Sequence, residues 1–238
     1  MNTKRFHTGL IGFVAAGLLA SGQAQAFGLD ALKSAAGAAL NTATQGGDNA
    51  SDTGALEQQH SDLMLRFNAS MNNMLMAQAK TLQATGNTDA ATQTLNAAQQ
   101  YAIGGVTDSD VILRDTQLTS TNQQLIQNAL SQAAAMSGEN RAMLIEAIPY
   151  YTAGIQEGGK LSGAFSQWIN NAQGSASSLL SNPMAAAQLT SSLSEASTIA
   201  RNLPALLSAW SGTSQSFMSY ATANQLDVGT LQTALNTH

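Results

Sequence analysis

The stretch that decides the fold runs from Glu139 to Ala172 and reads ENRAMLIEAIPYYTAGIQEGGKLSGAFSQWINNA. Its apolar and small residues recur at alternating spacings of four and three, which is the spacing of one face of an α-helix. These positions are Leu144, Ile148, Tyr151, Ile155, Gly158, Ser162, Phe165, Ile169 and Ala172. We therefore predict one long helix over residues 139–172, bent at Pro149 because proline removes a backbone donor. The adjacent Gly158 and Gly159 leave open a break at that point.

Helical spacing also recurs before this stretch, in segments separated by turn residues. Residues 55–85 carry an apolar stripe of Leu56, Leu63, Phe67, Met71, Met74 and Leu82. Gly86-Asn87-Thr88-Asp89 ends this helix and caps a second one over residues 89–102, whose stripe is Ala91, Leu95, Ala98 and Ala102. Glycine after a helix and Asn, Thr or Asp before one are the usual end signals. Two helices joined by a short turn are therefore expected here.

A third helix is predicted after Thr107-Asp108-Ser109-Asp110, which supplies an N-cap and negative charge for the first turn. Its stripe is Val111, Leu118, Leu125, Ala129, Ala133 and Met136, and Ser137-Gly138 closes it. Beyond residue 172, prolines at positions favoured in a first helical turn indicate two more helices, Pro183 to Asn202 and a second from Pro204. A last short helix carries Val228, Leu231 and Leu235.

Together these segments predict an all-α fold. The chain has three prolines, and only 5% of its residues are aromatic, which favours helix over sheet. We expect a single antiparallel bundle of about five to seven helices over residues 55–238, joined by short turns. The spacings Gly154-xxx-Gly158 and Gly159-xxx-Gly163 would let helix backbones approach closely.

Residues 1–26 have the pattern of a cleavable secretory signal peptide. Lys4 and Arg5 precede an apolar run over residues 9–20, and the stretch closes with Ala24-Gln25-Ala26. The alternative is a membrane anchor, but the run is short for a span and a small-x-small cleavage site follows it. Cleavage after Ala26 would leave a periplasmic or secreted protein that begins at Phe27. Because the chain has no cysteine, the new terminus cannot carry the lipid of a lipoprotein.

Residues 27–54 divide into a short amphipathic helix and a linker. Phe27, Leu29 and Leu32 are the first apolar positions, and the polar, glycine-containing stretch 45–54 is typical of a flexible linker. Two interpretations are open. The segment is a loosely docked tail, or it docks on a partner or a membrane surface.

Charge and hydropathy narrow the classes of partner. The chain has 9 Lys and Arg against 14 Asp and Glu, and loss of Lys4 and Arg5 leaves 7 against 14, a net charge of −7. Nucleic acid is then not an expected partner, because phosphate binding needs a basic surface. No segment after the signal peptide approaches 18 consecutive apolar residues, so we expect no transmembrane helix there.

The sequence contains no motif of a known catalytic class, such as Gly-x-Ser-x-Gly, His-Glu-x-x-His or a P-loop. His60 is the only histidine expected inside the fold, and Asp108 and Asp110 are better explained as helix-capping residues than as a calcium loop. We therefore predict no catalytic residues and no cofactor, which favours a protein other than an enzyme.

One cluster offers metal ligands. His60, Met64, Met71 and Met74 lie near one stripe of the predicted helix over residues 55–85. Thioether and imidazole groups suit monovalent copper, which exported proteins encounter. The alternative is core packing, because methionine fills irregular gaps between helices.

Large aromatic residues concentrate in the second half of the chain. Tyr151, Phe165, Trp168 and Trp210 are expected in the core, as aromatics at helical spacing usually are. They could instead line a pocket for an apolar ligand between the helices, where bundles commonly build binding sites.

These observations predict an exported, periplasmic, non-enzymatic helical protein that acts as an envelope accessory or interaction factor. Its partner would be another envelope protein. Two alternatives remain: a carrier or chaperone for an apolar small molecule held between the helices, and a copper-binding protein that uses the His60 and methionine cluster. The oligomeric state is left open.

Overall fold

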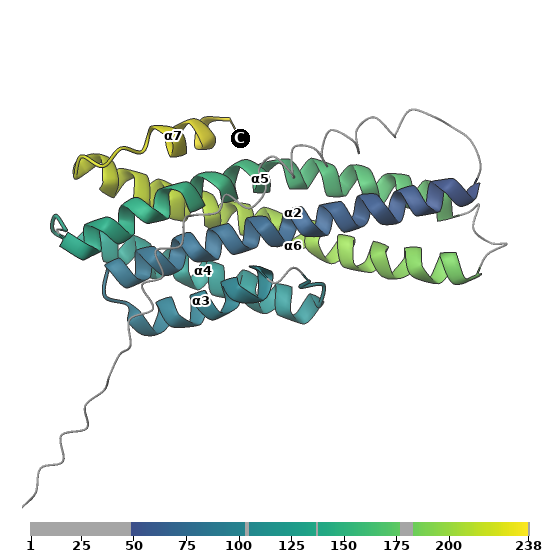
Figure 1. Ribbon diagram of the computed structural model, residues 1–238, viewed down its shortest axis with the longest axis horizontal. Helices are drawn as coiled ribbons and strands as arrows, with labels where there is room; N and C mark the ends of the chain where they lie inside the picture. The colour runs from purple at the N-terminus through teal and green to yellow at the C-terminus, as the bar shows by residue number, and fades with distance from the viewer. Residues whose placement is uncertain (1–48, 103–104, 137, 177–182, 238) are drawn as a thin grey trace, which may run out of the picture. The chain divides into compact units, whose positions relative to one another are not determined.

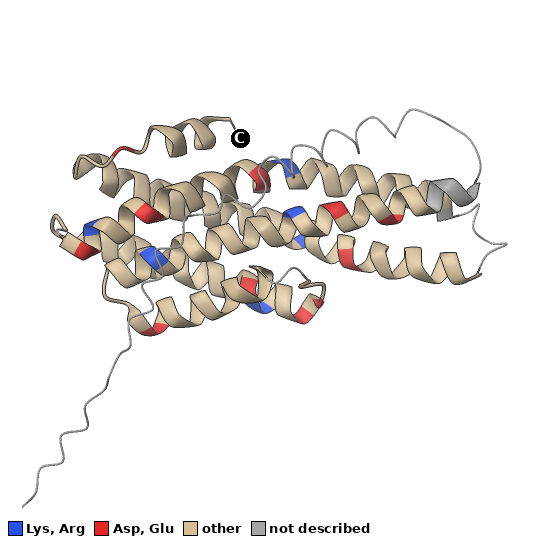
Figure 2. Ribbon diagram, viewed as in Figure 1, with Lys and Arg blue, Asp and Glu red and all other residues tan. Residues whose placement is uncertain are grey.

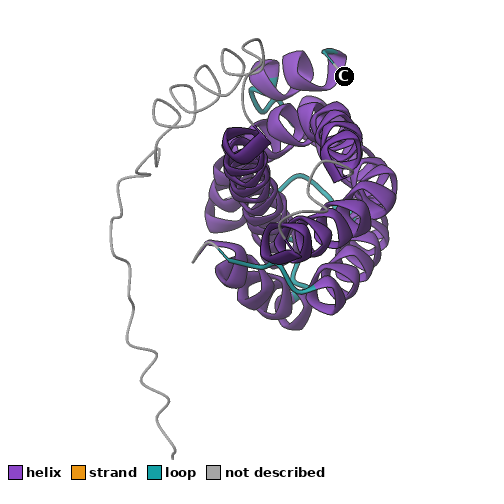
Figure 3. Cartoon of the chain, turned by 90° about the vertical axis from the view of Figure 1, so that its right-hand side faces the viewer, coloured by secondary structure: helices purple, strands orange, loops and turns teal. Residues whose placement is uncertain are grey.

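The computed structural model describes residues 49–102, 105–136, 138–176 and 183–237 of the chain. These residues form six helices and no strand, which confirms the predicted all-α fold (Figures 1 and 3). The helices are α2 (Asn49–Ala84), α3 (Thr88–Ala102), α4 (Ser109–Gln132), α5 (Gly138–Ala176), α6 (Pro183–Ala223) and α7 (Gly229–Asn236). All of them belong to one compact unit, Thr44–His238. Successive helices run in opposite directions, as in an antiparallel bundle (Figure 1).

Helix α2 lies at the centre of the bundle. From Arg66 to Leu82 none of its residues is exposed. It packs most extensively against α5 and α3, while α4 packs mainly against α6. With 36, 39 and 41 residues, α2, α5 and α6 are each about 50–60 Å long at 1.5 Å per residue. These three helices therefore extend past the shorter α3 and α4.

Two regions follow from this difference in length. The arm consists of residues 54–66 of α2, 162–175 of α5 and 183–202 of α6, where these three long helices pack together without α3 and α4 (Figure 1). The body consists of the described parts of residues 67–161 together with 203–237, where α3, α4 and α7 join them.

The predicted helix ends between α2 and α4 are confirmed. Gly86 has a φ of 81°, a left-handed conformation that glycine adopts without steric cost. Asn87 N–H donates to the Leu82 carbonyl at 2.8 Å, which closes the end of α2. Asp108 caps α4 because its carboxylate accepts hydrogen bonds from the backbone N–H groups of Asp110 and Val111.

The long helix of the opening stretch is confirmed as α5, which continues through Pro149 and through Gly158-Gly159. A β-carbon at Gly154 would lie 2.5 Å from Met74 Sδ, and one at Gly158 would lie 2.5 Å from the Trp210 ring. These two glycines therefore allow α2 and α6 to approach α5. Gly163 has nothing within 4 Å of its β-carbon position, so no neighbouring helix approaches α5 closely at that residue.

Helix α4 ends at Gln132, four residues before the predicted Met136. Ala133 has a ψ of 129°, which is extended backbone. The Tyr220 hydroxyl donates to the Ala134 carbonyl at 2.9 Å and accepts a hydrogen bond from Met136 N–H at 3.0 Å. A side chain of α6 thus satisfies the backbone groups that a further helical turn would have satisfied.

The predicted division between a helix ending at Asn202 and another beginning at Pro204 is wrong, because α6 is continuous from Pro183 to Ala223. An internal proline removes one backbone hydrogen bond and costs about 3 kcal/mol. One face of the turns on both sides is buried, with Ile199, Leu203 and Leu206 at 0% exposure. Apolar burial on this scale offsets the lost hydrogen bond.

At the N-terminus, the predicted signal peptide and the helix expected after Phe27 lie outside the described residues. Asn49–Gly54, which we expected to be linker, forms the first turns of α2. Extending an existing helix adds one hydrogen bond per ordered residue, so a packed helix can recruit poor helix formers at its end. The predicted last helix is confirmed as α7. Among the described helices, none is both long enough and apolar enough to cross a bilayer.

Candidate functional site

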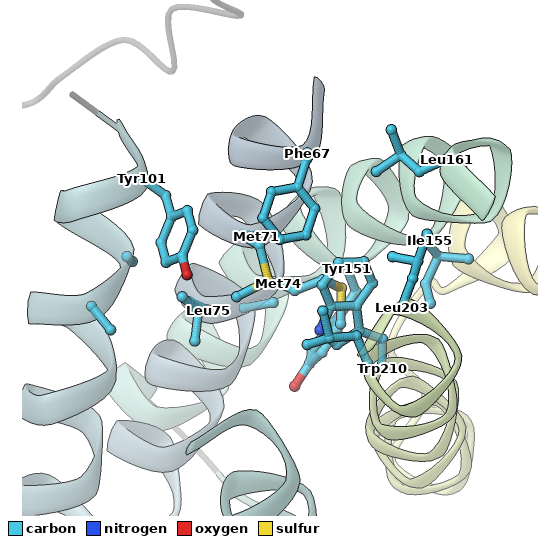
Figure 4. Close-up of a cluster of buried hydrophobic side chains, with 14 of the residues drawn as sticks. Phe67, Met71, Met74, Leu75, Tyr101, Tyr151, Ile155, Leu161, Leu203 and Trp210 are labelled. Atoms are coloured by element: carbon cyan, nitrogen blue, oxygen red, sulfur yellow. The ribbon is translucent and has the colours of Figure 1, made fainter. Parts of the chain in front are cut away.

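The four residues of the predicted copper site are all buried along α2 but do not all meet at one point. His60 and Met74 are fourteen residues apart, which is about 21 Å along a helix. Metal–ligand bonds are only about 2.0–2.3 Å long, so one ion cannot reach both ends of this set. Met74 packs against Gly154, and Met71 lies between the aromatic side chains of the core (Figure 4). The structure therefore places Met71 and Met74 in packing contacts away from His60.

His60 instead lies in the arm between α5 and α6. Its ring is 4.9 Å from that of Trp168, and its Nε2 is 3.8 Å from Glu195 Oε2. That distance exceeds a hydrogen bond, and buried Nε2 has no hydrogen-bond partner among the described residues. Burial lowers the pKa of His60 and raises the pKa of Glu195, so both shifts favour the neutral forms.

In the part of the chain that the structure describes, no three His, Cys, Asp or Glu side chains lie close enough together to hold a metal ion.

The four aromatic residues of the predicted ligand pocket are all buried, but each has a different neighbour. The Tyr151 hydroxyl lies 3.0 Å from Thr81 Oγ1, and its ring is 4.9 Å from that of Phe217. Burial raises the pKa of Tyr151. The Phe165 ring meets Phe67 edge to face at 6.4 Å. These contacts are directional and close, as in a packed core.

The two tryptophans complete this set. The Trp168 indole N–H donates to the Leu56 carbonyl at 2.9 Å, and Trp210 packs on Gly158. Tyr151 and Trp168 are seventeen residues apart on α5, or about 25 Å. The structure therefore distributes the four aromatic side chains along the core and does not gather them around one pocket.

Two open hollows on the described residues lie elsewhere. One of about 390 Å³ is lined by the α2–α3 turn and the segment between α4 and α5, including Gly86, Ala133 and Met136. The other, of about 320 Å³, lies beside residues 86–90. None of the four aromatic residues lines either hollow.

Sequence reasoning missed a buried polar cluster in the body. Asn122 Nδ2 donates to Gln78 Oε1 at 3.2 Å and to Thr94 Oγ1 at 2.8 Å. Gln78 Nε2 donates to the Thr119 carbonyl at 3.2 Å and to Thr213 Oγ1 at 3.3 Å. All five residues have 0% exposure. We call this set the amide cluster; it joins α2, α3, α4 and α6.

A second buried polar group lies two helical turns away along α3 and α4. The Asp115 side chain is 1% exposed, and Arg114 donates to both of its oxygens, at 2.8 and 3.2 Å. Burial, followed by the neighbouring Asp115 carboxylate, raises the pKa of Tyr101.

The predicted stripes of α3 and α4 are the reason for this omission. The buried face of α4 consists of Ile112, Asp115, Thr116, Thr119, Asn122, Ile126 and Leu130. The predicted positions Val111, Leu118 and Leu125 are only partly buried. Likewise Leu95 of α3 is 37% exposed, whereas Thr94 is buried. The sequence does contain a pattern that could have identified these buried polar residues. Thr94 and Tyr101 are seven residues apart, as are Asp115 and Asn122, and residues with this spacing lie on the same face of a helix.

Charged residues are sparse and scattered over the helices (Figure 2). The ion pairs include Lys80–Glu146 at 2.7 Å and Arg66–Glu157 at 3.4 Å. Such pairs at the edge of solvent are worth about 0–1 kcal/mol each. They form no concentrated charged surface.

Comparison of the chain with protein-family models, with curated protein sequences and with solved structures found no match.

Proposed function

We propose that the chain is an exported, non-enzymatic accessory protein of the cell envelope that acts by contacting another envelope protein through the outer faces of its helices. The leader-like pattern of residues 1–26 supports export. The long helices of the described unit supply extended, rigid surfaces of the kind that protein partners use.

The observation that carries this proposal is the placement of the side chains with binding chemistry. Tyr151, Phe165, Trp168 and Trp210 each fill a separate part of the core, and Met71 and Met74 do the same. The residues that face solvent are mostly neutral and polar. On α4 they include Gln117, Thr121, Gln124 and Asn128, which follow one another at helical spacing. A neutral polar surface favours short-range contacts with a fitted partner over long-range attraction of charged ligands.

Export is tested by fractionation and N-terminal sequencing of the full chain expressed in a bacterium with two membranes. We expect the protein in the periplasm, beginning at Phe27. A control variant, Leu18→Arg with Leu19→Arg, interrupts the apolar run and should remain inside the cell. A wild-type chain that keeps Met1 and stays in the cytoplasm would contradict the proposal.

Partner binding is tested by placing a photo-crosslinking residue at exposed positions on different faces. Gln124 of α4, Gln167 of α5 and Thr190 of α6 are suitable because all three are exposed. We expect a protein adduct of one mass that forms from one face and not from the others. Equal labelling from every face, or no adduct in the native host, would contradict a specific interaction surface. So would specific turnover of a substrate by the purified chain.

A further inference from the structure

A pair of ionisable side chains lies inside the arm. His60 of α2 and Glu195 of α6 face each other, with Nε2 3.8 Å from Oε2. The His60 side chain is 10% exposed and the Glu195 side chain 28%. Trp168 of α5 packs on the imidazole, with the two ring centroids 4.9 Å apart. One residue from each of the three long helices therefore meets at this point.

Few other charged residues lie near this pair. Residues 161–176 of α5 contain no charged residue, and Glu195 is the only charged residue over 183–200 of α6. On α2, the carboxylate of Glu57 lies one helical turn before His60. The ion-pair contact of His60 among the described residues is the one with Glu195. Glu195 is therefore the charged group that acts most directly on His60.

At neutral pH the two facing atoms cannot bond to each other. An ionised carboxylate only accepts hydrogen bonds, and so does an imidazole nitrogen that carries no hydrogen. The 3.8 Å separation is longer than a hydrogen bond and fits two such acceptors, so we assign the hydrogen of the neutral imidazole to Nδ1. A single proton taken up by either atom makes that atom a donor to the other.

Burial makes this proton uptake a property of the pair. It lowers the pKa of His60 from the usual 6.5 and raises the pKa of Glu195 from the usual 4.5, because each charged form loses contact with water. The two pKa values move toward each other, so the proton is bound by both groups together. Trp168 stabilises the protonated imidazole, since a cation within about 6 Å of an indole face is attracted to it.

We propose that His60 and Glu195 form a proton-dependent link between α2 and α6. In mildly acidic solution the pair takes up one proton, which is held in a hydrogen bond between His60 Nε2 and Glu195 Oε2. At neutral pH the proton is released and the two helices lose this bond. The amide cluster of the body contains no ionisable side chain, so its hydrogen bonds stay the same in both conditions.

An NMR titration of the His60 imidazole in the purified protein tests the pairing. The His60 signals are assigned by their loss in His60→Gln. Glu195→Gln removes the negative charge and should lower the midpoint of the His60 titration by about 1 pH unit or more, because an opposite charge within about 4–6 Å favours the charged imidazole.

The matched control for this titration is Glu57→Gln. It removes an equal charge from the helix that carries His60, one turn away, and should lower the midpoint by less than Glu195→Gln does. An unchanged midpoint in Glu195→Gln, or an equal change in the two variants, would overturn the proposed pairing.

Crystal structures of the wild type on either side of the midpoint test the bond itself. Below the midpoint we expect Nε2 and Oε2 to be about 2.7–2.9 Å apart, the length of a charge-assisted N–H···O bond. Above the midpoint we expect the separation of 3.8 Å. The same separation in both conditions would overturn the proposed link.

Discussion

In the arm, the helices meet through apolar side chains such as Leu63, Phe165 and Leu189, whereas in the body they meet around Gln78 and Asn122. Apolar contacts are non-directional, so the stability of the arm depends on the volume of the buried side chains more than on which atoms contact one another. The amide cluster needs every donor to find its acceptor, and an unmatched group costs more than an absent one. An apolar core therefore runs through both regions, and the body adds to it a buried set of matched hydrogen bonds.

The largest effect expected is from truncation in the arm. Phe165→Ala removes a fully buried ring that packs on Phe67, and large-to-small core changes of this kind cost about 3–5 kcal/mol. Denaturant unfolding of the variant and the wild type measures the difference. Phe165→Leu keeps most of the volume and should lose far less. A loss below about 1 kcal/mol in Phe165→Ala would mean that the arm is not close-packed.

The body should instead show coupling between residues. Asn122→Leu alone leaves Gln78 Oε1 without its donor, and an unpaired buried group costs about 1–3 kcal/mol. Gln78→Leu with Asn122→Leu replaces both partners, so the double variant should lose less than the sum of the two single losses. Additive losses in this cycle would contradict a directional interaction.

Two glycines of α5 provide a matched pair of substitutions. Gly158→Ala drives a methyl group into the Trp210 ring, and overpacking of this kind costs about 1–3 kcal/mol. Gly163→Ala meets nothing within 4 Å and replaces glycine in a helix, which should gain about 0.5–1 kcal/mol. Thermal unfolding of both variants checks the signs. Stabilisation by both would show that α5 and α6 do not approach at Gly158.

The buried tyrosines Tyr101 and Tyr151 should have the smallest effect on folding stability at neutral pH. At alkaline pH their effect on stability should be measurable. Burial raises the pKa of Tyr101 and of Tyr151 above the usual 10.0, with Asp115 adding to the shift at Tyr101. Above pH 10 the unfolded chain loses these protons and the folded chain retains them, so stability should fall as pH rises. Below pH 10 their contribution is fully present. Unfolding at about pH 9 and pH 11 measures this slope, which should be shallower in Tyr101→Phe.

Helices with an apolar buried face were easier to predict than helices with a polar one. The spacing in residues 139–172 identified α5 because its buried residues are apolar, aromatic or small, as the hydrophobic rule assumes. In α4 the same rule selected Leu118 and Leu125, although Thr119 and Asn122 are the buried residues. Their burial depends on partners on three other helices, which one helix's sequence does not reveal.

The continuity of α6 and the candidate sites illustrate the same limit. Pro204 has the local signature of a helix start, and only the packing of Leu203 and Leu206 overrides it. His60 and the methionines share a stripe in sequence, but helix rise separates His60 from Met71 and Met74 along α2. Spacing predicts which face a residue occupies; whether residues on that face share a site depends on distance along the helix and on the neighbouring helices.

The central claim is that the side chains with binding chemistry serve the core and that the protein acts through its surface. Native mass spectrometry of the protein isolated from its own envelope, without organic solvent or chelator, tests this most directly. We expect the mass of a chain that begins at Phe27, free of any small molecule or metal and associated with a protein partner in a fixed ratio. A reproducible excess mass corresponding to a lipid or to copper would contradict the claim.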